Sequence, residues 1–415
     1  MQPYDMKELE ERVILVGVQE SFSEDVEESL DELAELCETA GALVVGRVIQ
    51  NREKIHPGTY VGKGKIEEIA LLMEELGATG IVCDDELSPA QLNNLEKELD
   101  CKVMDRTLII LDIFAARANT SEGNIQVELA QLRYRAARLV GLRNSLSRLG
   151  GGIGTRGPGE KKLEMDRRLI HARISQLKAE LAQVQKHREL IRSKRKKDQM
   201  VVAAIVGYTN AGKSTLLNTL TDAGVLEEDK LFATLDPTTH LLELPGGQNI
   251  LLTDTVGFIR KLPHHLIEAF KSTLEEAKYA DIIIHVVDAS NPQKEKQMHV
   301  VYETLKDLGV KDQPILTLFN KQDRIENPEI LKDMKADKTL KISAKTGKGL
   351  DDLKDELEKI LCARSILLER VFPYEKAGLI QIVRAKGQLL EEEYRGDGIY
   401  VKAFVPAEIY GKVAY

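Results

Sequence analysis

Residues 207–214 read Gly207-Tyr208-Thr209-Asn210-Ala211-Gly212-Lys213-Ser214 and fit the phosphate-binding pattern G-x-x-x-x-G-K-[ST]. An apolar run at 201–206 precedes them and a helix-forming run at 215–220 follows, which is the strand–loop–helix context that the pattern requires. Backbone N–H groups of such a loop face the phosphates, and the positive end of the following helix adds to the attraction. We therefore expect Lys213 to reach the terminal phosphates and the Ser214 hydroxyl to bind Mg²⁺.

A second motif, Asp254-Thr255-Val256-Gly257, ends an apolar strand that begins at Ile250. This strand is expected to run beside the strand that leads into the phosphate-binding loop. From that position Asp254 orients Mg²⁺ through a water molecule, and the Gly257 N–H contacts the γ-phosphate. These two residues complete the phosphate side of a nucleotide site.

Two further motifs indicate which base is bound. Asn320-Lys321-Gln322-Asp323 follows the apolar strand at 315–319, and Ser343-Ala344-Lys345 follows a short strand at 339–342. A carboxylate at Asp323 contacts the N1–H and the N2 amino group of guanine, and adenine cannot make that pair of contacts. Lys321 lies along the base, Asn320 joins the loops, and the Ala344 N–H meets guanine O6. The four motifs in this order predict a GTP site rather than an ATP site.

The first switch is expected between the phosphate loop and the next strand, at Phe232-Ala233-Thr234-Leu235-Asp236. One threonine there would give its hydroxyl to Mg²⁺ and its N–H to the γ-phosphate, which orders the loop only when GTP is bound. We favour Thr234, 21 residues after Lys213. Thr238 and Thr239 are the alternatives, and otherwise they begin the next strand. The residues expected to act in hydrolysis are Lys213, Thr234 and Gly257.

Phe258 stands where many GTPases carry a glutamine that orients the attacking water. A phenylalanine cannot do this, so the chain alone is expected to hydrolyse GTP slowly. Asn210 is the residue that GTPases carry in this loop when K⁺ substitutes for an arginine finger. The other interpretation of Asn210 is that it only braces the first switch loop.

Composition narrows the class of protein. The chain has 415 residues, is 43% hydrophobic and carries a net charge of −9, which is typical of a soluble protein of two to four domains. Its apolar runs are all much shorter than 18 residues and its N-terminus has no signal-peptide pattern. The four cysteines form no C-x-x-C pair, which indicates reduced thiols rather than disulfides or metal ligands. We expect a cytoplasmic protein that acts as a monomer and has no membrane partner.

Positive charge is concentrated in one segment. Residues 131–197 carry 19 Lys and Arg against 5 Asp and Glu, although the chain as a whole is acidic. Such a segment is directed at a chosen polyanion. Apolar residues repeat there at helical spacing, which predicts two helices joined by a coiled-coil seam: Ile125, Leu129, Leu132, Ala136 and Leu139, then Leu163, Ile170, Ile174, Leu177, Leu181, Val184 and Ile191.

A glycine-rich tip joins the two predicted helices at 149–159. Glycines permit close approach to another backbone, and the flanking cations contact phosphates or stack on bases. The tip is either an RNA-binding element or a flexible surface loop, and the charge favours RNA. The candidate RNA-binding residues are Arg143, Arg148, Arg156, Lys161 and Lys162.

The predicted fold class is α/β, with four parts. An N-terminal α/β domain covers 1–120, the basic helical hairpin 121–198, a GTPase domain with a doubly wound sheet 199–362, and a small α+β domain 363–415. Within the first part, Gly62-Lys63-Gly64-Lys65 precedes a helix. This loop is either a weak second phosphate site or a tight strand–helix turn.

Over nearly its whole length the chain resembles the HflX family of translation-associated GTPases. The resemblance rests on the nucleotide motifs at 207–214, 232–236, 254–258 and 320–323, and on Gly151-Gly152-Ile153-Gly154-Thr155-Arg156-Gly157-Pro158-Gly159-Glu160 with Leu163-Glu164. The family pattern usually has Thr-Gln where this chain has Lys161-Lys162. That difference adds positive charge near the tip.

The resemblance implies binding to the large ribosomal subunit and its rRNA, with the hairpin tip directed toward the peptidyl-transferase region. It also implies that the GTP-bound protein splits or rescues stalled or idle ribosomes, and that ribosomal contact completes the active site that Phe258 leaves open. It assigns the Mg²⁺ contact of the first switch to Thr234, and it allows ATP hydrolysis by the N-terminal domain. Two alternatives remain: a GTPase that assembles immature ribosomal subunits, and a regulatory switch whose partner is a protein.

Overall fold

The computed structural model describes residues 10–20, 25–147, 158–197, 200–221, 224, 231–263, 266, 271–325, 330–363 and 365–413. The chain divides into two compact units. The first comprises Met1–Ile191, Glu228–Asp236 and Ile259–Thr273, and the second comprises Arg192–Glu227, Pro237–Phe258 and Leu274–Tyr415. Two short segments of the predicted GTPase domain therefore belong to the unit that contains the N-terminal domain and the hairpin.

The first unit begins with a four-stranded parallel sheet in the order β2-β1-β3-β4. Its strands are β1 (Arg12–Glu20), β2 (Leu43–Arg52), β3 (Gly80–Cys83) and β4 (Lys102–Asp105). Three helices connect them: α1 (Val26–Thr39), α2 (Lys63–Leu76) and α3 (Pro89–Leu99). Side chains of α2 and α3 pack on the strands in one apolar core that includes Ile14, Ile69, Ile81 and Leu95.

Local capping fixes where these helices begin. Ser88 and Gln91 form a capping box at the start of α3, and Pro89 occupies its first turn. Asp25 accepts a hydrogen bond from the Glu27 N–H at the start of α1. The chain makes its turn into α2 at Gly62, whose N–H donates to Gln50 Oε1 at 2.8 Å.

Helix α4 (Arg106–Arg117) was not predicted from the sequence. It starts directly after β4, because Asp105 is both the last residue of that strand and the N-cap of the helix, accepting from the Leu108 N–H at 2.9 Å. Tyr134 and Arg138 from the next helix also donate to the Asp105 carboxylate, at 2.8 and 2.6 Å. One buried carboxylate thus joins the sheet, α4 and the base of the hairpin.

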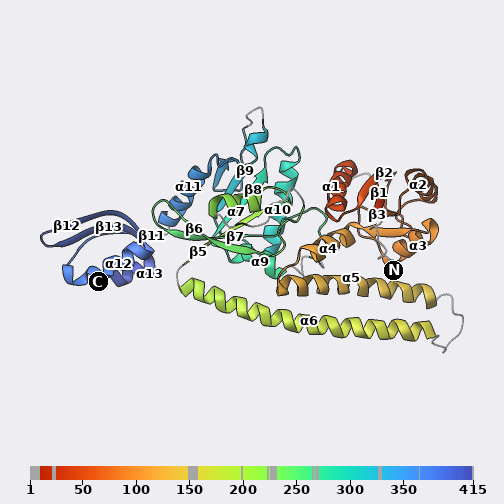
Figure 1. Cartoon of the computed structure of the whole chain (residues 1–415), viewed down its shortest axis with the longest axis horizontal. Helices are drawn as coiled ribbons and strands as arrows, with labels where there is room; N and C mark the ends of the chain where they lie inside the picture. The colour runs from red at the N-terminus through yellow and green to blue at the C-terminus, as the bar shows by residue number, and fades with distance from the viewer. Residues whose placement is uncertain are drawn as a thin grey trace, which may run out of the picture. The chain divides into compact units, whose positions relative to one another are not determined.

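The hairpin consists of α5 (Ser121–Ser147) and α6 (Pro158–Lys197), which lie side by side (Figure 1). Much of the seam expected from the apolar spacing is present: Leu129, Ile174 and Leu177 are buried, with Ile125, Leu132, Ala136, Ile170 and Leu181 packed against them. Leu139 and Val184 are half-buried outside this cluster, and the side chain of Leu163 lies outside the described residues. A two-contact ion pair between Arg173 and Glu128 flanks this seam, at 2.7 and 2.8 Å.

The seam does not continue to the end of α6, and the prediction for Ile191 is wrong. Ile191 is 41% exposed. The reason is geometric: α6 has 40 residues and α5 has 27, so the longer helix extends past the start of its partner. An ion pair between Arg188 and Glu122, at 2.8 Å, marks the level at which α5 begins.

The second unit contains a six-stranded sheet in the order β10-β9-β8-β5-β7-β6. All neighbours pair in parallel except β6, which runs antiparallel to β7 at the edge. The strands are β5 (Val201–Gly207), β6 (Thr238–Glu243), β7 (Asn249–Asp254), β8 (Ile282–Asp288), β9 (Ile315–Asn320) and β10 (Lys338–Lys341). The strand beginning at Ile250 does lie beside β5, as predicted. Thr238 and Thr239 begin strand β6.

Helices α7 (Lys213–Thr221) and α11 (Leu350–Ala363) share the apolar core of this sheet, to which Leu217, Ile284 and Leu357 contribute. Helices α9 (Lys271–Tyr279) and α10 (Lys294–Leu308) connect other strands. The four nucleotide motifs follow the carboxyl ends of β5, β7, β9 and β10, which is where open α/β sheets bind their ligands.

A three-stranded antiparallel sheet in the order β11-β13-β12 forms the C-terminal part of the second unit. Its elements are β11 (Ser365–Phe372), α12 (Ala377–Lys386), β12 (Gln388–Arg395), β13 (Gly398–Pro406) and α13 (Ala407–Val413). The two helices cover one face through Val383, Val401 and Ile409. This is the small α+β fold expected from the sequence.

None of the helices in the described ranges combines the length and the apolar character needed to cross a membrane. All four cysteines are free, with Cys37 and Cys83 buried and Cys101 and Cys362 partly exposed.

The two sides of α6 predict different responses to the same substitution. Leu177 is fully buried in the seam, whereas Leu190 is 69% exposed on the same helix. We expect Leu177→Ala to lower the stability of the hairpin by about 2–5 kcal/mol and Leu190→Ala to change it by about 0.5 kcal/mol or less. Native-state hydrogen exchange of α5 and α6 amides measures both, and equal effects would contradict the observed seam.

Candidate functional site

The phosphate-binding loop follows β5 and runs into α7, and two glycines shape it. A Cβ on Gly207 would lie 2.3 Å from the Val286 carbonyl oxygen, and one on Gly212 would lie 2.3 Å from Asn320 Nδ2. Gly212 also has a φ of +91°, which side chains rarely adopt. The loop therefore takes a shape that only glycine allows at both positions, and it leaves a concave backbone of the kind that holds phosphates.

Lys213 is buried at the start of α7, with 7% of its surface exposed. Its ammonium donates to the Tyr208 carbonyl at 2.8 Å, within the same loop. Burial, opposed by the charge of Asp254 and assisted by that of Lys321, lowers the pKa of Lys213 to about 8. A cation held in this way gains stability from any anion placed in the loop.

Ser214 and Asp254 lie next to one another, although 40 residues separate them. The Ser214 hydroxyl donates to Asp254 Oδ2 at 2.9 Å, and Asp254 is fully buried at the end of β7. A hydroxyl oxygen and a carboxylate oxygen are ligands of the type that Mg²⁺ prefers. The residues therefore fit the ion that the motif implies, and Ser214 and Asp254 are the ones that would hold it.

Gly257 and Phe258 are pressed against the phosphate-binding loop. A Cβ on Gly257 would lie 2.8 Å from Thr209 Cγ2 and 3.0 Å from Lys213 Nζ. Phe258 exchanges backbone hydrogen bonds with the loop: the Thr209 N–H donates to the Phe258 carbonyl at 2.8 Å, and the Phe258 N–H donates to the Gly207 carbonyl at 3.1 Å. The Phe258 side chain is only 2% exposed, so it is part of the packing and offers no polar group to a water molecule.

Asn320 holds the two ends of the nucleotide site together. Its side-chain amide donates to the Ala211 carbonyl at 2.9 Å, and its Oδ1 accepts from the Ala344 N–H at 2.9 Å. The role predicted for Asn320, joining the loops, agrees with this geometry. The structure gives the Ala344 N–H a partner inside the protein. Its expected contact with guanine O6 therefore requires this hydrogen bond to be shared or exchanged.

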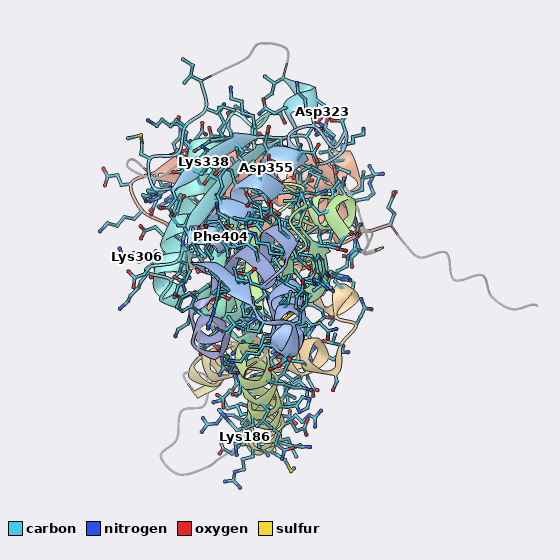
Figure 2. The ribbon with its side chains drawn as sticks, turned by 90° about the vertical axis from the view of Figure 1, so that its left-hand side faces the viewer. Lys186, Lys306, Asp323, Lys338, Asp355 and Phe404 are labelled. Carbon is cyan, nitrogen blue, oxygen red and sulfur yellow. The ribbon has the colours of Figure 1, made fainter. Side chains whose placement is uncertain are left out.

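Asp323 is exposed at the surface of the second unit (Figure 2). It accepts a hydrogen bond from the Ser343 hydroxyl at 2.6 Å, and this bond lowers the pKa of Asp323 despite some opposing burial. The carboxylate is thus held ionised, as recognition of guanine N1–H and N2 requires. Lys321 has a φ of 60° and pairs with Asp288 at 2.8 Å, which fixes its side chain beside the same loop.

The second unit therefore contains most of the residues proposed for the nucleotide site: Gly207, Tyr208, Thr209, Asn210, Ala211, Gly212, Lys213, Ser214, Asp254, Thr255, Val256, Gly257, Asn320, Lys321, Asp323, Ser343, Ala344 and Lys345. The first-switch candidates Phe232, Ala233, Thr234, Leu235 and Asp236 belong to the first unit. Their assignment to the nucleotide stays a prediction. Of the proposed RNA-binding residues, Arg148 and Arg156 lie outside the described residues, as do the side chains of Arg143, Lys161 and Lys162.

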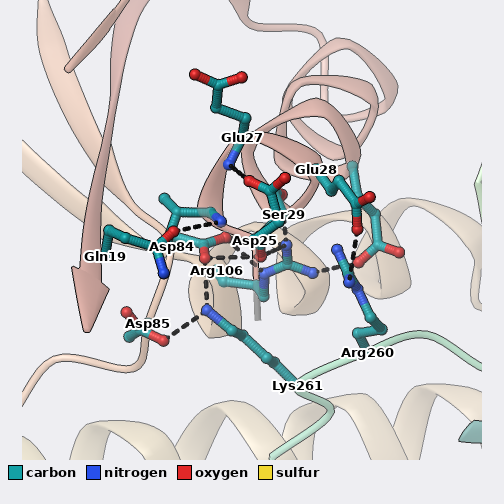
Figure 3. Close-up of polar contacts among 12 residues, drawn as sticks. Gln19, Asp25, Glu27, Glu28, Ser29, Asp84, Asp85, Arg106, Arg260 and Lys261 are labelled. Atoms are coloured by element: carbon teal, nitrogen blue, oxygen red, sulfur yellow. Dashed lines mark hydrogen bonds and ion pairs between the residues drawn. The ribbon is translucent and has the colours of Figure 1, made fainter. Parts of the chain in front are cut away.

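A cluster of buried charges in the first unit was not anticipated from the sequence (Figure 3). Arg106, 1% exposed at the start of α4, pairs with Asp84 at 3.0 Å and with Glu32 at 2.5 Å. Lys261, four residues after Gly257, reaches Asp84 and also Asp85, the latter at 2.7 Å. Burial alone would raise the pKa of Asp84, but Arg106 and Lys261 outweigh it and lower that pKa.

Three family models match consecutive parts of the chain. Residues 27–115 match "GTP-binding GTPase N-terminal", residues 117–195 match "GTP-binding GTPase Middle Region", and residues 202–321 match "50S ribosome-binding GTPase".

Whole-chain relatives carry the same family name. The chain is 69% identical over 410 residues to GTPase HflX of Lacrimispora saccharolytica, covering 99% of this chain and 97% of that one. It is 51% identical over 399 residues to GTPase HflX of Caldanaerobacter subterraneus subsp. tengcongensis, covering 96% and 92%. It is 43% identical over 353 residues to GTPase HflX of Escherichia coli strain K12, covering 84% and 83%.

The doubly wound sheet, the phosphate-binding loop and the base-recognition motifs define a P-loop GTPase, an enzyme that hydrolyses GTP to GDP and phosphate. With relatives this similar along nearly the whole chain, the protein belongs to the HflX family of GTPases.

The buried lysine predicts that nucleotide binding is coupled to proton uptake. The phosphates favour the charged form, so they raise the pKa of Lys213 from about 8 in the protein alone. Above pH 8 the protein must then take up a proton when it binds GDP, and the affinity falls as pH rises. Calorimetry at pH 8.5 in two buffers of different ionisation enthalpy should show uptake approaching one proton. Absence of uptake would contradict the assigned environment.

The ionised Asp323 predicts a change of base preference. In Asp323→Asn the side chain offers one donor and one acceptor, which matches the C2 carbonyl and the N1–H of xanthine rather than guanine. Hydrogen bonds to a charged group contribute about 1.5–3 kcal/mol each, so GTP affinity should fall roughly tenfold to several hundredfold while XTP affinity rises. Competition binding measures both, with Asp307→Asn, an exposed carboxylate on α10, as the matched control.

Proposed function

We propose that this GTPase binds the large ribosomal subunit and, in its GTP state, dissociates or rescues stalled or idle ribosomes. The observation that carries the proposal is the hairpin. A nucleotide site and a long basic helical hairpin occur in one chain, and GTP-dependent binding to ribosomal RNA requires both. The description of the matching GTPase model, "50S ribosome-binding GTPase", names the same target.

The dimensions and surface of the hairpin support this function. Helix α6 has 40 residues, which corresponds to about 60 Å at 1.5 Å per residue. Its apolar seam packs it against α5. Exposed cations lie along it at Arg168, Lys178, Lys186 and Lys194, of which Lys186 is labelled in Figure 2. The proposed RNA contacts at the tip are Arg143, Arg148, Arg156, Lys161 and Lys162, and rRNA offers them both phosphates and unpaired bases.

We propose that ribosomal contact stimulates hydrolysis. Phe258 occupies the place of the water-orienting glutamine and is fixed by packing and by two backbone hydrogen bonds. The missing function must then come from a group outside the chain or from a bound cation. Asn210 has a φ of 58° in the phosphate-binding loop and is the residue through which K⁺ would act. Mg²⁺ would be held by Ser214 and Thr234, with Asp254 acting through water.

A second nucleotide site in the N-terminal domain stays a prediction, and the geometry at Gly62 favours a structural turn. The Gly62 N–H is used by Gln50, and Lys65 pairs with Glu68 at 2.7 Å. Both groups that a phosphate would need have protein partners. Binding of labelled ATP that survives Lys213→Ala would support such a site.

Charge reversal at the tip tests the role of the hairpin. In a variant carrying Arg148→Glu, Arg156→Glu, Lys161→Glu and Lys162→Glu, hydrolysis without ribosomes should be unchanged. Because each lost phosphate contact weakens binding and its salt dependence, affinity for purified large subunits should fall on the order of tenfold or more. Co-sedimentation with a non-hydrolysable GTP analogue over a range of salt concentrations measures this.

The matched control reverses four exposed lysines outside the hairpin: Lys54, Lys306, Lys311 and Lys332. This variant has the same change in net charge, so it separates tip contacts from the overall field of the protein. If the tip variant binds subunits as tightly as the control, the hairpin does not bind the RNA, and a protein partner becomes the better account.

A further inference from the structure

The first-switch segment is attached to the start of the hairpin through Asp236. Its carboxylate accepts from the backbone N–H groups of Asn119 and Thr120, at 3.0 and 2.9 Å, and from the Thr120 hydroxyl at 2.5 Å. These residues form the turn between α4 and α5. Asp236 thus satisfies backbone donors just before α5 and places a negative charge at the positive end of that helix.

Gly123 leaves the space that the Asp236 carboxylate occupies. Gly123, in the first turn of α5, is buried, and a Cβ there would lie 2.4 Å from Asp236 Oδ1. The Gly123 N–H donates to the Thr120 hydroxyl at 2.9 Å, and that hydroxyl donates onward to Asp236. A continuous chain of hydrogen bonds therefore runs from the switch segment into the backbone of α5.

Phe232, at the other end of the first-switch segment, packs against helix α4. Phe232 is 2% exposed, has a φ of 54°, and meets Phe114 of α4 edge to face with 4.7 Å between ring centroids. Thr234 lies between these two contacts. The segment is consequently held at both of its ends by α4 and the turn that leads into α5.

The segment that follows Gly257 shares a buried carboxylate with the start of α4. Arg106, in the first turn of α4, shares Asp84 with Lys261 (Figure 3). The first-switch segment thus packs on α4 directly at Phe114, whereas the segment after Gly257 is linked to α4 only through Asp84. Only three residues, Ala118 to Thr120, separate α4 from α5.

We propose that Asp236 is a positioning residue that couples the nucleotide state of the first switch to the hairpin. The proposal rests on the role proposed above for Thr234. Two residues of extended chain span about 7 Å at most, so ordering of Thr234 by GTP restricts where the Asp236 carboxylate can lie. The carboxylate in turn fixes the first turn of α5, whose far end carries the tip. By thermodynamic linkage, a partner bound at the tip must change the affinity for GTP by the same factor by which GTP changes the affinity for that partner.

The test is a double-mutant cycle in the intact protein with Asp236→Ala and Thr120→Val. Thr120→Val removes the hydroxyl and keeps the shape of the side chain. In the wild type, exchange of amides 122–125 should differ between GDP and a non-hydrolysable GTP analogue. Each single variant should reduce this nucleotide-dependent difference in exchange and lower the ratio of GTP to GDP affinity several-fold. The double variant should show little more than either single variant, because both substitutions remove the same interaction.

Two controls separate coupling from structural damage. Asp112→Ala removes an exposed carboxylate on α4 and should leave both readouts unchanged. Asp236→Asn keeps one acceptor oxygen and should restore part of the nucleotide-dependent difference, whereas general destabilisation of α5 would raise exchange equally in both nucleotide states.

A third variant distinguishes the two proposals on which the coupling depends. Thr234→Ala should abolish the nucleotide-dependent exchange. If it does so while Asp236→Ala leaves the difference intact, the coupling role of Asp236 is wrong and the first-switch assignment stands. If both variants leave the difference intact, the assignment of Thr234 is wrong as well, and the coupling falls with it.

Discussion

Burial of one cation organises the nucleotide site. Lys213 is enclosed by a loop that two glycines bend, and its pKa falls because water is excluded from it. Such a charge is costly unless an anion or a set of carbonyl dipoles accompanies it. Around it, Asp254 supplies a nearby charge, Gly257 closes the space above the ammonium, and Asn320 ties the loop to the base-recognition motifs. These groups follow three neighbouring parts of the sheet, strands β5, β7 and β9, and the sheet brings the carboxyl ends of these strands to one edge.

The parts of the structure that could be predicted from the sequence are those set by the spacing of nearby residues. The phosphate-binding loop, the strands that lead into the nucleotide motifs and much of the coiled-coil seam follow from local spacing, and these are present. Helix α4 was missed because its N-cap, Asp105, doubles as the end of a strand. The ends of the seam were misjudged because a heptad pattern carries no information about the length of the partner helix, and Ile191 lies beyond the start of α5.

The contacts that join the parts of the protein could not be predicted from sequence. Thr120 and Asp236 are 116 residues apart, and Lys261 and Asp84 are 177 apart. No local pattern distinguishes Asp236 from any other aspartate in a loop, and the motif around Thr234 led us to assign the whole segment to the nucleotide. The structure instead shows the Asp236 carboxylate at the start of the hairpin and the Phe232 ring against α4. These contacts are the basis of the mechanical role proposed for Asp236.

The central claim is that the chain binds and positions GTP but relies on the ribosome to complete hydrolysis. The most direct measurement is GTP turnover by the protein alone and with purified large ribosomal subunits, in K⁺ and in Na⁺ buffer. We expect slow turnover by the protein alone, at most modestly faster in K⁺ than in Na⁺, and strong stimulation by the subunits, since stabilising groups supplied by a partner raise the rates of GTPases by roughly 10³–10⁵-fold. A basal rate that is already high in K⁺ and does not respond to subunits would contradict this claim.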